Sequence, residues 1–145
     1  MVLVVDDEPL LHVITTRVLD RAGFDVLNAQ DGLEAIELLS QASRPPSLVV
    51  TDIRMPRMDG LELGKWVQSR YPGIPLLYVS GFLYEVPPIN PEPGPTAFLG
   101  KPFTPDAFLV EVRRLCARNG GCGGFVAPGD GRELPPDART GRRPA

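Results

Sequence analysis

Short apolar runs alternate with amphipathic segments along the first 118 residues of the chain. The runs are bounded by turn-forming or charged residues, and a short continuous apolar run is typical of a strand covered on both faces. The third run ends at Thr51 and Asp52. Five strands are therefore predicted, at residues 2–5, 24–29, 48–50, 74–79 and 96–99.

The amphipathic segments have apolar residues three and four positions apart, the spacing of an α-helix. Pro9 suits the first turn of the first helix, and Gly23 suits its C-terminal cap. Asp31 and Asp59 each precede a glutamate by three residues, which resembles a capping box. Thr104 begins the last helix. The apolar residues at helical spacing are Leu10, Ile14 and Val18; Leu33, Ile36 and Leu39; Leu63, Trp66 and Val67; and Phe108, Val112 and Leu115.

Strands that alternate with helices predict right-handed crossovers and a parallel sheet covered by helices on both faces. One connection departs from this pattern. Between the fourth and fifth strands the chain reads FLYEVPPINPEPGPTAF, which contains five prolines. Because proline removes a helix donor and clashes with the preceding turn, we expect an irregular loop there, with at most one helical turn at residues 83–86.

The composition changes at residue 119. Residues 119–145 contain 7 glycines and 4 prolines among 27 residues and few large apolar side chains. Such a segment buries too little surface to offset its ordering entropy. We therefore expect one domain over residues 1–118 and a disordered Gly/Pro-rich tail over residues 119–145.

Charge and composition narrow the function classes. The net charge of −3 gives no reason to expect a nucleic-acid or membrane surface, and no apolar stretch could span a membrane. Met1 is followed at once by VLVV, without the basic leader of a secretory signal. Cys116 and Cys122 lack partners at metal-ligand spacing. We expect a cytoplasmic protein with two free thiols.

Polar residues follow the predicted strands at the edge where a parallel sheet binds its ligands. Asp6 and Asp7 end the first strand, Asp52 the third and Ser80 the fourth, and Lys101 follows the fifth. Each residue alone could be structural, since an aspartate after a strand is commonly a helix cap. If the first and third strands are neighbours, three carboxylates meet a hydroxyl and an ammonium in one crevice.

Three converging carboxylates require a counter-charge, and Mg²⁺ is the natural one because it takes hard oxygen ligands and phosphate oxygens. No histidine or cysteine lies near these positions to favour zinc. Lys101 could pair with a carboxylate or hold a phosphate oxygen. A carboxylate beside Mg²⁺ can attack a phosphoryl group, so the pattern favours a phosphoryl-transfer site.

The motifs VVDDE, VVTDIRMPRMDG, YVSG and FLGKPF resemble those of receiver domains of two-component response regulators, over about residues 2–118. The Lys-Pro bond of the last motif is usually cis in that family. The ending FLGKPFTPDAFLVEVRRL is most similar to receivers of hybrid histidine kinases. The resemblance implies a flavodoxin-like (CheY-like) doubly wound α/β fold, a five-stranded parallel sheet in the order 2-1-3-4-5. The proline-rich loop would replace most of the family's fourth helix.

The resemblance also implies a metal site and an acceptor. Asp52 would be the phosphoacceptor and a direct Mg²⁺ ligand. Asp7 would bind Mg²⁺ directly, Asp6 would bind it through water, and the Arg54 backbone carbonyl would be a third direct ligand.

Further residues would read out the phosphorylated state. Ser80 would hydrogen-bond the phosphoryl group, and Lys101 would pair with it. Phe98 occupies the aromatic switch position and would move together with Ser80. Arg54 and Phe82, at the positions that tune self-hydrolysis, offer no carboxylate or amide to orient water. We therefore expect a long-lived phosphoaspartate.

The function implied is a phosphorelay module, not an enzyme with turnover, that accepts phosphate from a histidine kinase or phosphotransfer domain and switches binding of a downstream protein. It could belong to a larger hybrid kinase. The alternative is a degenerate receiver that binds a partner independently of phosphorylation, which the prolines favour. A phosphatase of the haloacid dehalogenase type, with an aspartate nucleophile, would carry an Asp-x-Asp motif after the first strand. That reading is disfavoured because residue 8, the position of the second aspartate, is Glu8. His12 is expected to lie on a solvated helix surface.

Overall fold

The computed structural model describes residues 1–81 and 95–118, and these form one five-stranded parallel sheet with helices on both faces. The strand order is β2-β1-β3-β4-β5, as expected. The proline-rich loop and the predicted tail fall largely or wholly outside the described residues. The strands are β1 (Val2–Val5), β2 (Val26–Ala29), β3 (Leu48–Asp52), β4 (Leu76–Ser80) and β5 (Thr96–Gly100), and the helices are α1 (Pro9–Arg21), α2 (Gly32–Gln41), α3 (Gly60–Arg70) and α4 (Pro105–Arg118).

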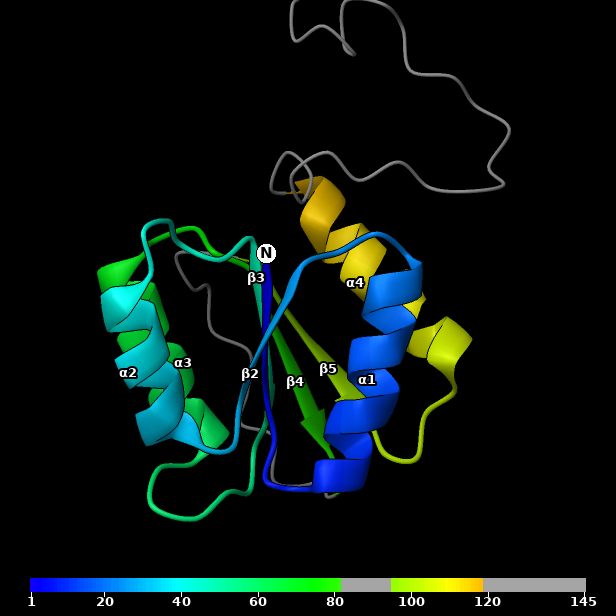
Figure 1. Ribbon diagram of the computed structural model, residues 1–145, viewed down its shortest axis with the longest axis horizontal. Coiled ribbons are helices and arrows are strands. Elements are labelled where there is room, and N and C mark those ends of the chain that lie inside the picture. The colour runs from blue at the N-terminus through cyan, green and yellow to red at the C-terminus, as the bar shows by residue number, and fades with distance from the viewer. Residues whose placement is uncertain (82–94, 119–145) are drawn as a thin grey trace, which may run out of the picture.

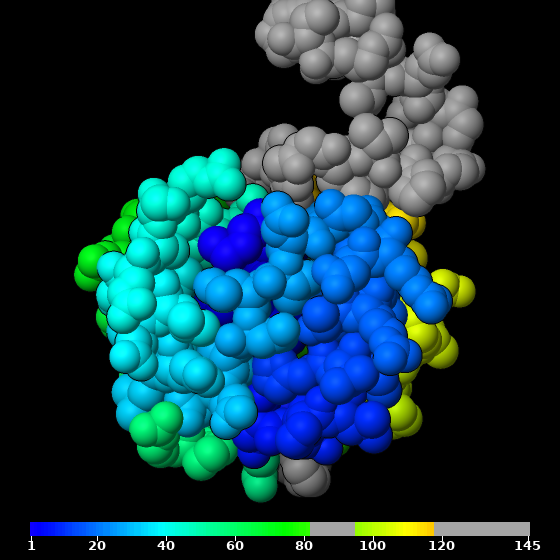
Figure 2. Space-filling view, in the orientation of Figure 1, coloured from blue at the N-terminus to red at the C-terminus, as the bar shows by residue number. Residues whose placement is uncertain are grey.

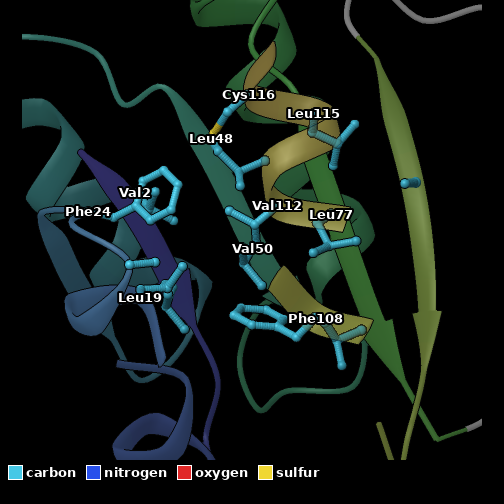
Figure 3. Packing of buried hydrophobic residues seen from close by; sticks show 14 residues of the cluster. Val2, Leu19, Phe24, Leu48, Val50, Leu77, Phe108, Val112, Leu115 and Cys116 are labelled. Carbon is cyan, nitrogen blue, oxygen red and sulfur yellow. The ribbon is translucent and has the colours of Figure 1, made fainter. Parts of the chain in front are cut away.

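The sheet separates two hydrophobic clusters (Figure 1). Helices α1 and α4 cover one face, where Phe108 and Val112 of α4 pack fully buried against Val50 and Leu77 (Figure 3). Helices α2 and α3 cover the other face. In the space-filling view, the β2 edge is visible between the blue surface of α1 and the cyan surface of α2 (Figure 2). Burial on both faces explains why the strands are short apolar runs rather than alternating patterns.

The helix starts confirm the predicted caps. The Asp31 carboxylate accepts the Glu34 backbone N–H at 2.9 Å. At the start of α3, Asp59 and Glu62 form a complete capping box, each side chain accepting the other residue's backbone N–H. Each cap satisfies N–H groups that would otherwise lack a partner in the first helical turn.

The buried face of α1 differs from the predicted one. Thr15 and Leu19 are buried, whereas Leu10 is 71% exposed and Ile14 41% exposed. Thr15 can occupy a core position because its hydroxyl donates to the Leu11 carbonyl at 2.8 Å. Thr15 is polar, so the apolar pattern did not mark the inner face.

Two smaller expectations also change. Strands β2 and β4 begin at Val26 and Leu76, each two residues later than predicted. Cys116 is buried in the cluster beneath α4 and is disulfide-bonded, so the expectation of a free thiol is wrong for it. Among the helices of the described segments, none is both long and apolar enough to cross a membrane.

Candidate functional site

The carboxyl ends of the strands converge at one edge of the sheet, at the bottom of Figure 1. Strand β1 pairs with β3, with Val5 opposite Thr51, so the next residues, Asp6 and Asp52, follow at neighbouring strand ends. Asp52 in turn lies opposite Val79, immediately before Ser80. The topology therefore brings together Asp6, Asp52 and Ser80, which the sequence singled out at separate strand ends.

Lys101 lies at the centre of this group. Its Nζ is 3.1 Å from Asp52 Oδ2, 3.1 Å from Glu8 Oε1 and 3.6 Å from Asp6 Oδ2. Its backbone N–H donates to the Ser80 carbonyl at 2.9 Å, which fixes the chain just after β5. The Lys101–Pro102 peptide bond is cis, as the resemblance implied. One ammonium thus serves three carboxylates.

Burial and charge shift the acidity of these groups. Burial raises the pKa of Asp6 and of Asp52 above the ordinary value, and attraction to Lys101 offsets this only in part. Burial alone would lower the pKa of Lys101, but the charges of Asp6 and Asp52 and hydrogen bonds to Asp52 and Glu8 raise it. The ammonium therefore stays protonated, and the carboxylates gain from any further positive charge.

The donor set fits a hard divalent cation. Carboxylate oxygens of Asp6, Glu8 and Asp52 all lie within 4.8 Å of one another. Oxygen-only donors with partly buried carboxylates suit Mg²⁺ rather than a softer metal. Asp7 is exposed and does not belong to this group, although its charge contributes to raising the pKa of Asp52.

Two residues at the start of α1 and just before it were missed or misjudged from the sequence. Glu8 was not selected, yet it contacts Lys101. His12 is half-buried rather than solvated: its ring nitrogens contact the Asp6 backbone carbonyl and, at 3.0 Å, Asn28 Oδ1. No local signal marks the contact of His12 with Asn28, because His12 lies on α1 and Asn28 on β2.

The loop after β3 is anchored at both ends. Gly60 donates its N–H to the Ile53 carbonyl at 2.8 Å. A Cβ on Gly60 would lie 2.0 Å from the Asp52 backbone oxygen, so only glycine permits this approach. Arg57, at φ 70°, donates from Nε and Nη2 to Asp31 Oδ2 at 2.9 and 2.5 Å. The loop containing the exposed Arg54 is therefore tied to both α2 and β3.

The two proposed readout residues lie on adjacent strands. Ser80 is buried at the end of β4. Phe98 is partly buried, and its ring stacks on that of Tyr78 with centroids 5.1 Å apart and planes 19° apart. Phe82 lies outside the segments that the structure describes.

The fold and site define a class: a doubly wound α/β domain with an acidic, lysine-containing centre at the carboxyl edge of its sheet. Residues 2–113 match the family model described as response regulator receiver domain. The chain belongs to this family of two-component signalling domains, which is not a family of classical enzymes.

Individual relatives agree with this membership. The chain is 31% identical to the sensor kinase CckA of Brucella abortus over 79% of this chain and 12% of that protein. It is 30% identical to the alkaline phosphatase synthesis regulator PhoP of Bacillus subtilis over 81% of this chain and 49% of that protein. The solved receiver domain of the hybrid histidine kinase CckA superposes with a TM-score of 0.67 at 28% identity, covering 79% of this chain and 96% of that one. The chain thus spans about half or less of these curated relatives.

Proposed function

We propose that the domain accepts a phosphoryl group on Asp52 from a phosphohistidine of a histidine kinase or phosphotransfer domain. The observation that supports this most directly is the position of Lys101, 3.1 Å from a buried Asp52 carboxylate at the edge of the sheet. We expect the domain to act in the cytoplasm, where ATP is available to phosphorylate the donor histidine.

In this proposal an Asp52 carboxylate oxygen supplies the electron pair for the new O–P bond. The P–N bond to the donor imidazole breaks, and its electron pair stays on that nitrogen, which can then take up a proton. Lys101 and Ser80 neutralise and bind phosphoryl oxygens during transfer. Mg²⁺, when bound, neutralises the charge that develops on the same oxygens.

We assign the Mg²⁺ ligands as the family pattern suggests. Asp52 and Asp7 would bind directly, Asp6 through water, and Arg54 through its backbone carbonyl. The convergence of Asp6 and Asp52 supports half of this set. Asp7 is exposed beside the site and would need its side chain to turn inward, which its exposure permits.

A groove beside the site supports docking of a protein donor. It measures about 360 Å³, runs between α1 and the start of α4, and reaches Glu8 and Lys101 at one end. Its lining includes the exposed apolar residues Leu10 and Ile14. The groove shares Lys101 with the acceptor site, so a partner bound in the groove would lie beside Asp52. The same donor could be a kinase of which this domain is a part.

The readout would use Ser80 and Phe98. When Ser80 moves to bind the phosphoryl group, it vacates space beneath the sheet edge into which the Phe98 ring can turn. Phe98 lacks the hydroxyl of tyrosine, so its positions would differ in free energy by packing alone, including the stack on Tyr78.

The test is incubation with acetyl phosphate and Mg²⁺ followed by intact mass measurement. We expect one phosphoryl adduct on the wild type, none on Asp52→Asn, and a normal adduct on Asp20→Asn, a control on the exposed surface of α1. A degenerate, phosphorylation-independent receiver would give no adduct, and multiple turnover of a phosphate ester would indicate a phosphatase. The intact grouping of Asp6, Asp52 and Lys101 disfavours the degenerate receiver, and Glu8, which stands where an Asp-x-Asp motif would have its second aspartate, disfavours the phosphatase.

The adduct should also be long-lived. Arg54 offers no carboxylate or amide to align an attacking water, and neither does Phe82 from its sequence identity. Decay of the adduct after removal of acetyl phosphate measures this lifetime, and a half-life of seconds in Mg²⁺ buffer would contradict the expectation.

A further inference from the structure

Glu8 is the one member of the acidic group with an exposed side chain. Its side chain is 63% exposed, against 9% for Asp52 and 5% for Asp6. Its backbone is nevertheless held in place, because its N–H donates to Asp6 Oδ1 at 2.8 Å. The Glu8 backbone is therefore fixed, whereas its carboxylate can turn away from Lys101 into solvent at little cost.

That carboxylate shares Lys101 with the acceptor. Lys101 Nζ contacts Glu8 Oε1 and Asp52 Oδ2 at equal distances of 3.1 Å, and an oxygen of Glu8 lies within 4.8 Å of one of Asp52. An ammonium has three N–H donors, and a phosphoryl group on Asp52 would need at least one of them. Glu8 would then face the phosphoryl oxygens as a like charge.

Glu8 also lies where the donor must arrive. It lines the apolar groove together with Lys101, and its carboxylate shares the Lys101 ammonium with Asp52, so a phosphodonor that reaches Asp52 comes close to the Glu8 carboxylate. A small anionic donor meets uncompensated negative charge there. A protein donor can place a positively charged side chain opposite Glu8 and remove the repulsion.

We propose that Glu8 is a specificity-determining residue that disfavours small anionic phosphodonors by competing with the incoming phosphoryl group for Lys101. This inference rests on Asp52 as the acceptor. With acetyl phosphate, an Asp52 oxygen forms the new O–P bond, and the bond from phosphorus to the acetyl oxygen breaks with its electron pair leaving on acetate. No proton or further reactant is needed.

The experiment measures the initial rate of adduct formation against acetyl phosphate concentration for wild type, Glu8→Gln, Glu8→Ala and Asp20→Asn. Each variant is assayed at a Mg²⁺ concentration that saturates it, so that a change in metal affinity does not contribute. We expect both Glu8 variants to lower the half-saturating acetyl phosphate concentration about three- to tenfold, the effect of one nearby charge at an exposed position. The maximal rate should change less, and Asp20→Asn should behave as wild type.

Salt provides an independent readout that a purely structural effect would not move. The difference between wild type and Glu8→Gln should shrink as ionic strength rises, because exposed charges are screened. An unchanged or higher half-saturating concentration in the Glu8 variants, or an equal shift in Asp20→Asn, would overturn the inference. Failure of the wild type to form any adduct would instead contradict the proposed function.

Discussion

Replacing Gly60 with alanine should disturb both the stability of the domain and the position of its acceptor. The new Cβ would lie 2.0 Å from the Asp52 backbone oxygen and 3.0 Å from the Ile53 Cα. An ordinary C···O contact is about 3.3 Å, so the start of α3 or the end of β3 must move by about 1.3 Å. Both contacts are with backbone atoms, which cannot turn aside as a side chain could.

The expected cost combines two opposing effects. Overpacking of this kind costs about 1–3 kcal/mol, while alanine gains up to about 1 kcal/mol of helix propensity over glycine. We expect the free energy of unfolding to fall by about 1–2 kcal/mol. Because a misplacement of about 1 Å at a reacting group can cost about 100-fold in rate, adduct formation at Asp52 should slow by about 10- to 100-fold.

Urea unfolding followed by the fluorescence of Trp66, the single tryptophan, measures the first effect, and intact mass against time measures the second. Gly81→Ala is the control for stability, since a Cβ there meets nothing within 4 Å. Surface substitutions usually change the free energy of unfolding by no more than about 0.5 kcal/mol. If Gly60→Ala changes it by no more than that and is phosphorylated at the wild-type rate, the close packing of α3 against Asp52 is refuted.

Two further predictions concern the caps and the α3 packing. Burial alone would raise the pKa of Asp31, but the Glu34 N–H and the Arg57 guanidinium lower it below the ordinary value. Asp31 therefore stabilises the fold at any pH above its pKa in the unfolded chain. This stabilisation is lost as the pH falls through the lower pKa that Asp31 has in the folded protein. Asp31→Ala should cost about 1–2 kcal/mol in urea unfolding at pH 7, and this difference should narrow below about pH 4; a constant difference down to pH 3 would contradict it. Gly64→Ala should be destabilising because its Cβ would lie 1.9 Å from the Tyr78 hydroxyl oxygen. The loss should be at least about 1 kcal/mol smaller in a Tyr78→Phe background, and equal losses in both backgrounds would refute the contact.

Local pattern was sufficient for most of the architecture. The helix starts agree with the sequence because capping pairs such as Asp59 and Glu62 act within a few residues, and the continuous apolar runs fit a sheet covered on both faces. The strand order agrees with the order that the resemblance to receiver domains implied. The convergence of Asp6, Asp52 and Lys101 follows from the strand-end rule for parallel sheets together with the pairing of β1 and β3, which the sequence itself had left as a condition.

The predictions that were wrong or missing concern side chains whose position depends on contacts between distant segments, or on a polar group that an apolar pattern does not include. Thr15 is a core residue of α1 because its hydroxyl is satisfied within its own helix, whereas Leu10 and Ile14 line a surface groove. Glu8 and His12 acquire their roles from Lys101 and Asn28, which are remote in the chain. The periodicity of apolar residues in one helix carries no information about contacts with residues this far away in the chain.

The most direct test of the account locates the phosphoryl group. Wild-type protein is incubated with acetyl phosphate and Mg²⁺, reduced with borohydride, which converts a phosphorylated aspartate to homoserine, and digested for peptide mass spectrometry. The account predicts homoserine at position 52 alone. Modification at Asp6 or Asp7 in its place, or no modified carboxylate in any peptide, would contradict it.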